Sequence, residues 1–251
     1  MKSLRQVVAG VRRRLDERRF PFVVTLRDFD SAGVRFEVSN LVERLRIIDH
    51  GSETDYTAAM IADLRKDDVL FDVGANVGMV ALHAAKICQV VAFEPDPYYG
   101  GRLENNMALN PNWSFTIESI AVSDKDGSLT LHTEGGAGTS PSLVRQRGET
   151  ASVVVSGRSL DSLMAEGRLP RPTVIKLDIE GAEILALRGG LGLLSGPNRP
   201  RALYIELHDT FLGGFESSAD EVYELLREFG YTKKIYSSKR DDQTHLILYR
   251  D

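Results

Sequence analysis

The stretch that most constrains the fold is residues 69–78, V-L-F-D-V-G-A-N-V-G. The apolar run Val69 to Phe71 is typical of a buried parallel strand, and the acid Asp72 follows it. Gly74 and Gly78 flank Asn76, so the backbone can turn tightly into a helix that we expect to begin near Val77. Unpaired amides at a helix start favour a bound carboxylate or phosphate. The junction therefore predicts a nucleotide-binding site.

The spacing of the glycines indicates which nucleotide this site binds. A dinucleotide loop needs G-x-G-x-x-G, whereas residues 74–78 read G-x-N-x-G, which argues against a nicotinamide-dependent oxidoreductase. Asp72 suits an ammonium group, and Glu94, which closes the next apolar strand at 90–93, is placed for a ribose diol. An amino acid joined to a ribose describes S-adenosylmethionine. The competing interpretation is an ordinary strand, turn and helix without a ligand.

Length and composition exclude several classes of protein. A chain of 251 residues, 42% hydrophobic and 27% charged, is long enough for one large α/β domain. The net charge of −5 argues against a general nucleic-acid surface. No apolar run approaches the roughly 20 residues of a membrane-spanning helix, and the N-terminus lacks a secretory apolar core. We therefore expect a cytoplasmic protein that does not span a membrane and has no general nucleic-acid surface, although a local basic surface stays open.

The first 49 residues predict a cap on the main domain. Residues 2–19 place apolar side chains at helical spacing among many arginines. This helix either binds an anionic surface or, as we favour, packs on the body or on a second copy in a homodimer. Phe22 to Leu26 and Val34 to Val38 predict a β-hairpin. The predicted division is a cap at 1–49 and a cofactor-binding domain at 50–251.

From residue 50 onward, strand and helix patterns alternate almost throughout, which indicates a mainly parallel sheet covered on both faces. After the two strands described above, the expected strands are Phe115 to Ile117, Val174 to Asp178, Ala202 to Leu207, Thr232 to Ser237 and His245 to Tyr249, with short ones at Leu129 to His132 and Ser152 to Val155. The glycine-rich stretch Gly135 to Ser142 is expected to be a mobile lid, or else a disordered excursion.

Further cofactor contacts are expected at the ends of these elements. Glu53 and Tyr56, at the start of a helix over 52–64, can reach the methionine end, although a cap and a core aromatic are equally good interpretations. The loop after the third strand faces the adenine. Its candidates are Ser119, Ile120, Ala121 and Asp124, and Asp124 serves equally well in a plain turn.

Four motifs, in order along the chain, resemble the FkbM-type family of S-adenosylmethionine-dependent methyltransferases. They are F-D-V-G-A-N-V-G at 71–78, F-E-P-D at 93–96, S-L-D-S-L at 159–163 and I-K-L-D-I-E-G-A-E at 175–183. The resemblance covers roughly residues 50–210, and the last motif is the most specific. It implies a Rossmann-like class I methyltransferase sheet of seven strands with the last strand antiparallel. It also implies O-methylation of a sugar, a polyketide or another small hydroxylated metabolite.

The resemblance also suggests residue roles. Asp72, Gly74, Asn76 and Gly78 would form the cofactor loop, Glu94 with Pro95 would hold the ribose, and Asp178 would lie near the methionine and the acceptor.

An acceptor alcohol must lose its proton during methyl transfer. His208, which follows the fifth strand, is the candidate general base, because histidine titrates near neutral pH, and Asp178 is its rival. A histidine satisfying a helix end is the alternative.

We predict no metal. A magnesium site of Asp178, Glu206 and Asp209 is the less favoured option. Two other functions remain open. An RNA-directed methyltransferase is motivated by the basic first helix alone, and a non-catalytic cofactor-binding scaffold is compatible with the same motifs.

Overall fold

The computed structural model describes residues 20–29, 31–48, 53–133, 140–145, 151–240 and 243–251. The helix expected at 2–19, and with it the dimer contact, lies outside these residues. Residues 135–139 of the expected lid lie outside them as well. Within the described part of the chain, no helix is long and apolar enough to cross a membrane.

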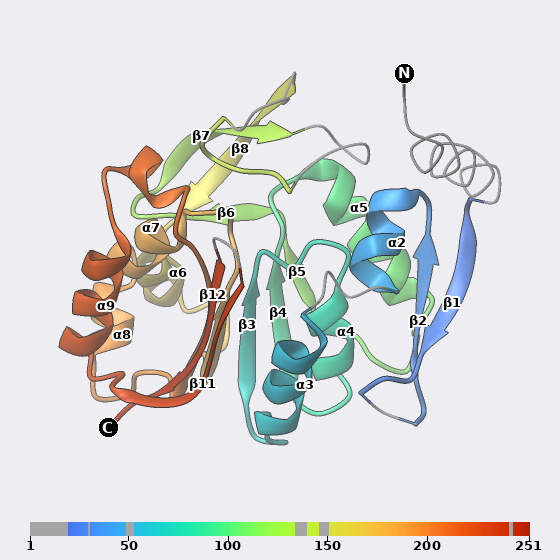
Figure 1. The fold of residues 1–251 in the computed structure, drawn as a ribbon, viewed down its shortest axis with the longest axis horizontal. Coiled ribbons are helices and arrows are strands. Elements are labelled where there is room, and N and C mark those ends of the chain that lie inside the picture. Colours follow the sequence, from blue (N-terminus) through green and yellow to red (C-terminus); the bar gives the residue numbers. More distant parts are fainter. Residues whose placement is uncertain (1–19, 30, 49–52, 134–139, 146–150, 241–242) are drawn as a thin grey trace, which may run out of the picture.

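A seven-stranded sheet forms the centre of the molecule (Figure 1), in the order β11-β12-β10-β9-β3-β4-β5. Its strands are β3 (Val69–Val73), β4 (Gln89–Phe93), β5 (Thr116–Glu118), β9 (Val174–Leu177), β10 (Ala202–His208), β11 (Lys233–Arg240) and β12 (Gln243–Tyr249). Strand β12, the last in the chain, runs antiparallel to both of its neighbours. The prediction of a mainly parallel sheet of seven strands with the last one antiparallel is therefore confirmed.

Helices cover both faces of this sheet, because its strands are apolar on both sides. One face packs against α6 (Leu160–Glu166), α7 (Glu183–Arg188), α8 (Leu191–Ser195) and α9 (Ala219–Glu228). The other packs against α3 (Thr54–Asp63), α4 (Met79–Ala84) and α5 (Pro97–Ala108). A short 3₁₀ turn, η3 (Leu212–Phe215), follows β10. Helix α4 begins two residues later than expected, since Gly78 with φ 93° is its N-cap.

The expected hairpin is present as β1 (Phe22–Leu26) and β2 (Val34–Val38). A helix that we did not expect, α2 (Leu41–Ile47), follows it. The Asn40 side chain accepts from the amide of Glu43, and Glu43 reaches back to the amide of Ser39. This pair of contacts is a variant of the capping box, and the short length of the helix concealed it in the sequence.

The chain leaves the central sheet at Ser119 and forms a second small sheet above its edge (Figure 1). Strands β6 (Ile120–Val122), β8 (Ala151–Arg158) and β7 (Gly127–Thr133) pair in that order. The short strands expected near 129–132 and 152–155 are β7 and β8. The third strand of the main sheet, expected at Phe115 to Ile117, is β5, and Ile120 belongs to β6.

The hairpin and α2 share a core cluster with Val77, Leu82 and Tyr99, which belong to the main domain. A buried ion network supports this contact. The Arg102 guanidinium, on α5, lies 2.5 Å from Glu37 and 2.9 Å from Glu43. Glu43 is fully buried, so its charge depends on Arg102 for compensation.

Replacing Arg102 by alanine should lower the free energy of unfolding by about 3–5 kcal/mol, because Glu43 would be left as an unpaired buried charge. Chemical denaturation measures this loss. Arg168→Ala is the matched control, since Arg168 pairs with Glu118 with more than half of its side chain exposed, and it should cost less than about 1 kcal/mol. Equal losses in the two variants would contradict the argument.

Candidate functional site

Two adjoining cavities lie at the carboxyl ends of the parallel strands, where ligand crevices of open α/β sheets form. The first has about 630 Å³ of space, part of it open to solvent, and is lined by residues that include Phe93, Glu94, Pro95, Ile120, Ala121, Val122 and Leu131. The second has about 870 Å³ and is lined by residues that include Arg46, Glu53, Tyr56, Lys176, Glu206 and Gln243. Gly74, Asn76, Ser140, Asp178 and Glu180 line both.

The loop after β3 forms the floor shared by the cavities. Gly74 has φ 83°, and a Cβ added there would lie 1.9 Å from the backbone oxygen of Asp178. Only glycine therefore lets the loops after β3 and β9 come this close. Asn76 follows with φ 51°, and its side-chain oxygen accepts from the amide of Val77 at 2.9 Å. The loop is thus held rigidly with its backbone facing the cavities.

Glu94 closes β4 and anchors this loop. One carboxylate oxygen accepts from the amide of Asn76 at 2.8 Å, and the other accepts from the amide of Asp96 at 2.9 Å. Burial raises the pKa of Glu94 to about 7, against the opposing effect of these two amides. Each carboxylate oxygen carries two lone pairs. Both oxygens can therefore accept one further hydrogen bond from a diol in the first cavity.

Asp72 lies beneath the loop and lines neither cavity. It is fully buried, and Lys176 Nζ lies 3.1 Å from it, 3.2 Å from Asp178 and 3.1 Å from the backbone oxygen of Gly74, to which it donates. Burial alone would lower the pKa of Lys176, but Asp178 and Asp72 together raise it. Lys176 is therefore a permanent buried cation that holds the ends of β3 and β9 together.

His208 lies behind the second cavity, enclosed by acids. Its Nδ1 is 3.0 Å from Glu183, and its Nε2 is 3.6 Å from both Glu180 and Glu206. Burial opposes the imidazolium, but the hydrogen bond and charge of Glu183, with the neighbouring acids, raise the pKa of His208 to about 11. The base role of His208 stays a prediction. This environment does not favour it, because an imidazolium cannot accept a proton.

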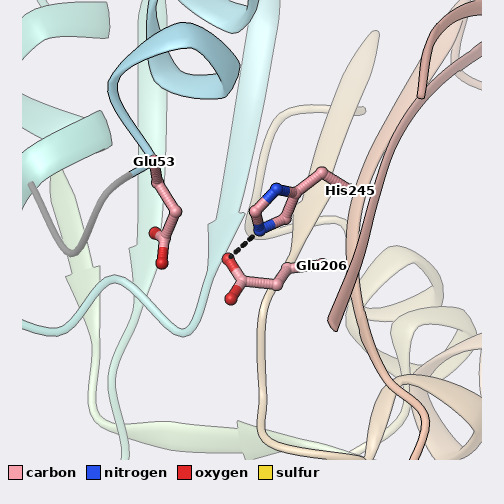
Figure 2. Close-up of side chains that lie close together, drawn as sticks. All are labelled: Glu53, Glu206 and His245. Carbon is pink, nitrogen blue, oxygen red and sulfur yellow. Dashed lines mark ion pairs between the residues drawn. The ribbon is translucent and has the colours of Figure 1, made fainter. Parts of the chain in front are cut away.

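The acidic wall of the second cavity continues across β10 and β12. Glu206 lies between Glu53 and His245, and His245 Nε2 is 3.6 Å from it (Figure 2). Burial and the charge of Asp178 raise the pKa of Glu206 to about 8. Tyr56 stacks on the His245 ring at 4.6 Å. This cavity therefore suits a polar acceptor with several hydroxyl groups.

The predicted residues divide into two groups by position. Those that line a cavity are Glu53, Gly74, Asn76, Glu94, Pro95, Ala121 and Asp178. Those that do not are Asp72, Gly78, Ser119, Asp124 and His208. Ser119 and Asp124 are exposed, and Gly78 faces Leu103 in the core. The roles of all of them as ligand contacts remain predictions.

Sequence reasoning missed several lining residues. Arg46 reaches the second cavity from α2, where its guanidinium donates to Asn76 at 3.2 Å and to the Ser140 hydroxyl at 2.8 Å. No local pattern signals Arg46, because α2 itself was not expected. Glu180 lies in the turn after β9 and has a φ of 54°. Its position in the I-E-G turn was the available signal, since strained turns often lie at functional sites.

Comparison with known proteins gives a consistent result. The family model described as "Methyltransferase FkbM domain" matches residues 72–233. The hexuronic acid methyltransferase AglP of Haloferax volcanii is 29% identical over 83% of this chain and 82% of its own length. The 2-O-methyltransferase NoeI of Sinorhizobium fredii is 27% identical over 66% and 73%. The 31-O-demethyl-FK506 methyltransferase FkbM of Streptomyces tacrolimicus is 29% identical over 68% and 75%.

Among solved structures, methyltransferase FkbM from Methylobacillus flagellatus KT superposes with a TM-score of 0.53 and 17% identity. The match covers 77% of this chain and 48% of that one, so the chain spans about half of the solved structure. At this level of identity the likeness concerns the fold, which is that of a class I methyltransferase.

Gly74→Ala should destabilise the protein by more than about 1 kcal/mol, because alanine at positive φ is strained and its Cβ has no space. Gly101→Ala is the control, since a Cβ at Gly101, within α5, meets no atom within 4 Å, and it should leave stability equal or higher. Thermal unfolding compares the two. Similar stability in both variants would contradict the close approach of the loops after β3 and β9.

Proposed function

Because the chain belongs to the FkbM family of methyltransferases, we propose that it transfers the methyl group of S-adenosylmethionine to a hydroxyl of a small, polar acceptor. The family implies the cosubstrate. The observation that carries the assignment is the pair of cavities that meet at Asp178. The lining of the first suits an adenosine, and the lining of the second is rich in charged groups. Donor and acceptor can then meet at a single carboxylate.

The first cavity fits the nucleoside part of the donor. Ile120, Ala121 and Val122 offer an apolar wall for a purine, and Glu94 offers two carboxylate oxygens for the ribose hydroxyls. The glycine loop leaves room for the amino acid part beside Asn76. Ala121 and Glu94 both line the first cavity, which supports the proposed contacts of Ala121 with the adenine and of Glu94 with the ribose.

The second cavity is assigned to the acceptor. Relatives named as acting on a hexuronic acid, or as 2-O- and 31-O-directed enzymes, support oxygen as the methylated atom. Among the described residues, the contacts of Arg46 are to neutral groups, namely Asn76, Ser140 and the face of the Tyr99 ring at 5.0 Å. Its charge is thus available for an anionic acceptor. We infer that sugar acids are the preferred class.

The chemistry asks little of the protein beyond placement. S-adenosylmethionine supplies an activated methyl group on sulfur, and the chain must hold the acceptor oxygen in line with it. Asp178 faces both cavities, and burial, which would raise its pKa, is outweighed by Lys176 and His208, which lower it. It is therefore ionised, and it can hold the acceptor hydroxyl by accepting its hydrogen bond. Because the lowered pKa makes Asp178 a weak base, the proton released by methyl transfer passes on to solvent. Asp72 supports this arrangement from below through Lys176.

Direct assays separate this proposal from its alternatives. Calorimetry should show binding of S-adenosylhomocysteine, and mass spectrometry should show methyl uptake by a hydroxylated sugar or sugar acid. Binding without transfer to any acceptor would favour the non-catalytic scaffold. The RNA-directed alternative depends on residues 2–19, outside the described part of the chain, and predicts that deleting them abolishes RNA binding.

Binding of S-adenosylhomocysteine should weaken about tenfold between pH 8 and pH 6, because a carboxylate with a pKa of about 7 becomes protonated there and stops accepting from the ribose. The sign follows from the raised pKa, since the ligand favours the ionised form that dominates above pH 7. Glu94→Gln should bind more weakly at pH 8 and lose this pH dependence. Calorimetry at both pH values tests it, and parallel pH profiles for the two proteins would refute it.

Arg46→Gln should lower kcat/KM for a sugar acid by about 10–100-fold, the value of a charge-assisted hydrogen bond. The matching neutral sugar should lose much less. Arg44→Gln, two residues away on α2 and lining neither cavity, is the control. If acidic and neutral sugars lost activity equally in Arg46→Gln, the preference for an anionic acceptor would be wrong.

A further inference from the structure

Three side chains converge where β9 and β10 end. Asp178, Glu206 and His208 each offer one ligand atom, and these atoms all lie within 4.8 Å of one another. His208 is only 2% exposed, and its Nε2 atom makes no hydrogen bond within the described part of the chain. That atom points toward Glu206 at 3.6 Å. A buried ring nitrogen without a hydrogen bond, directed at carboxylates, is costly unless something else binds it.

The other side of the ring has the arrangement found around metal-bound histidines. Nδ1 of His208 lies 3.0 Å from Glu183, a fully buried carboxylate. The same Glu183 oxygen accepts from the amides of Ile179 and Gly181, which fixes its position. A carboxylate that binds Nδ1 orients the ring and leaves Nε2 as the ligand atom. Glu183 is thus placed as a positioning residue.

The charge balance points the same way. Around this point the described residues include the carboxylates of Asp178, Glu180, Glu183 and Glu206, while Lys176 already lies against Asp72 and Asp178. Strand alternation explains why His208 belongs to the group and Asp209 does not, since residues 206 and 208 share one face. Asp209 instead pairs with Lys239 at 3.2 Å, so the magnesium set considered from the sequence does not assemble.

We propose that Asp178, Glu206 and His208 bind a divalent first-row transition metal ion at the wall of the second cavity. One imidazole with two carboxylates favours Mn²⁺, Fe²⁺ or Zn²⁺ over Mg²⁺, which prefers oxygen ligands alone. Asp178 and Glu206 line the second cavity, so an ion held by them would be accessible from that cavity. If the proposed O-methylation holds, on which this role rests, the ion would bind the acceptor hydroxyl and ease its loss of a proton. Asp178 would then hold that hydroxyl through the ion.

A second triad shares Glu206 and must be distinguished from the first. Glu53, Glu206 and His245 also bring ligand atoms within 4.8 Å of one another (Figure 2). The Nδ1 atom of His245 faces the hydroxyl of Ser238 at 3.3 Å rather than a carboxylate. In the first triad a carboxylate, that of Glu183, contacts Nδ1 of the histidine, whereas in the second triad this contact is made by a hydroxyl.

Manganese binding tests the proposal. The chain of 251 residues is stripped with a chelator and titrated with Mn²⁺, with the free ion followed by electron paramagnetic resonance. We expect one ion per chain, at least tenfold weaker binding in Glu206→Gln and His208→Gln, and unchanged binding in Glu53→Gln. Glutamine at 208 can still donate to Glu183. Glu183→Gln should weaken binding by about 10–100-fold.

Absence of manganese binding by the wild-type protein would overturn the proposal. So would a loss in Glu53→Gln with none in His208→Gln, which would assign the ion to the second triad. Circular dichroism melting checks that each variant is folded. Calorimetry with S-adenosylhomocysteine is run on the stripped protein. If S-adenosylhomocysteine does not bind, the proposed function is contradicted, and the result on metal binding still stands.

Discussion

The buried contact of Lys176 with Asp72 and Asp178 is the interaction on which the site depends. The two acids end neighbouring parallel strands, and the lysine lies between them with its ammonium also donating to the backbone of Gly74. Removing three charges from water is expensive, and only close mutual contact offsets the cost. The same contact sets the distance between the loops after β3 and β9. The glycine turn can approach the Asp178 backbone because the lysine pulls both strand ends together.

This arrangement divides the acids at the sheet edge by function. Asp72 pairs with Lys176 beneath the loop and lines neither cavity. Asp178 pairs with the same lysine but also lines both cavities. Burial raises the pKa of Glu94 to about 7, because the backbone amides that bind it offset only part of the desolvation, whereas Lys176 and His208 lower the pKa of Asp178. Acids of identical chemistry thus acquire different protonation behaviour from what lies within about 4–6 Å of each.

Much of the fold could be predicted from the sequence, because its determinants are local. The apolar run before Asp72, the glycines at 74 and 78 and the acid at 94 each specify a strand end or a turn within a few residues. What could not be predicted depends on contacts distant in sequence. Arg46 enters the second cavity only because α2 packs on α5 through Glu43 and Arg102. Asp124, which the sequence left open between an adenine contact and a plain turn, lies exposed between β6 and β7 and lines neither cavity.

The environment of His208 shows why residue type and position are insufficient to assign a chemical role. A histidine at the carboxyl end of a central strand is a reasonable general base when its surroundings are unknown. Glu183, the first residue of α7, changes that inference, because it binds Nδ1 and is itself fixed by two backbone amides. The ring is then oriented and its second nitrogen directed at Glu206. In a region this acidic, such a nitrogen either carries a proton permanently or gives its lone pair to a cation, and both outcomes remove it from proton transfer at neutral pH.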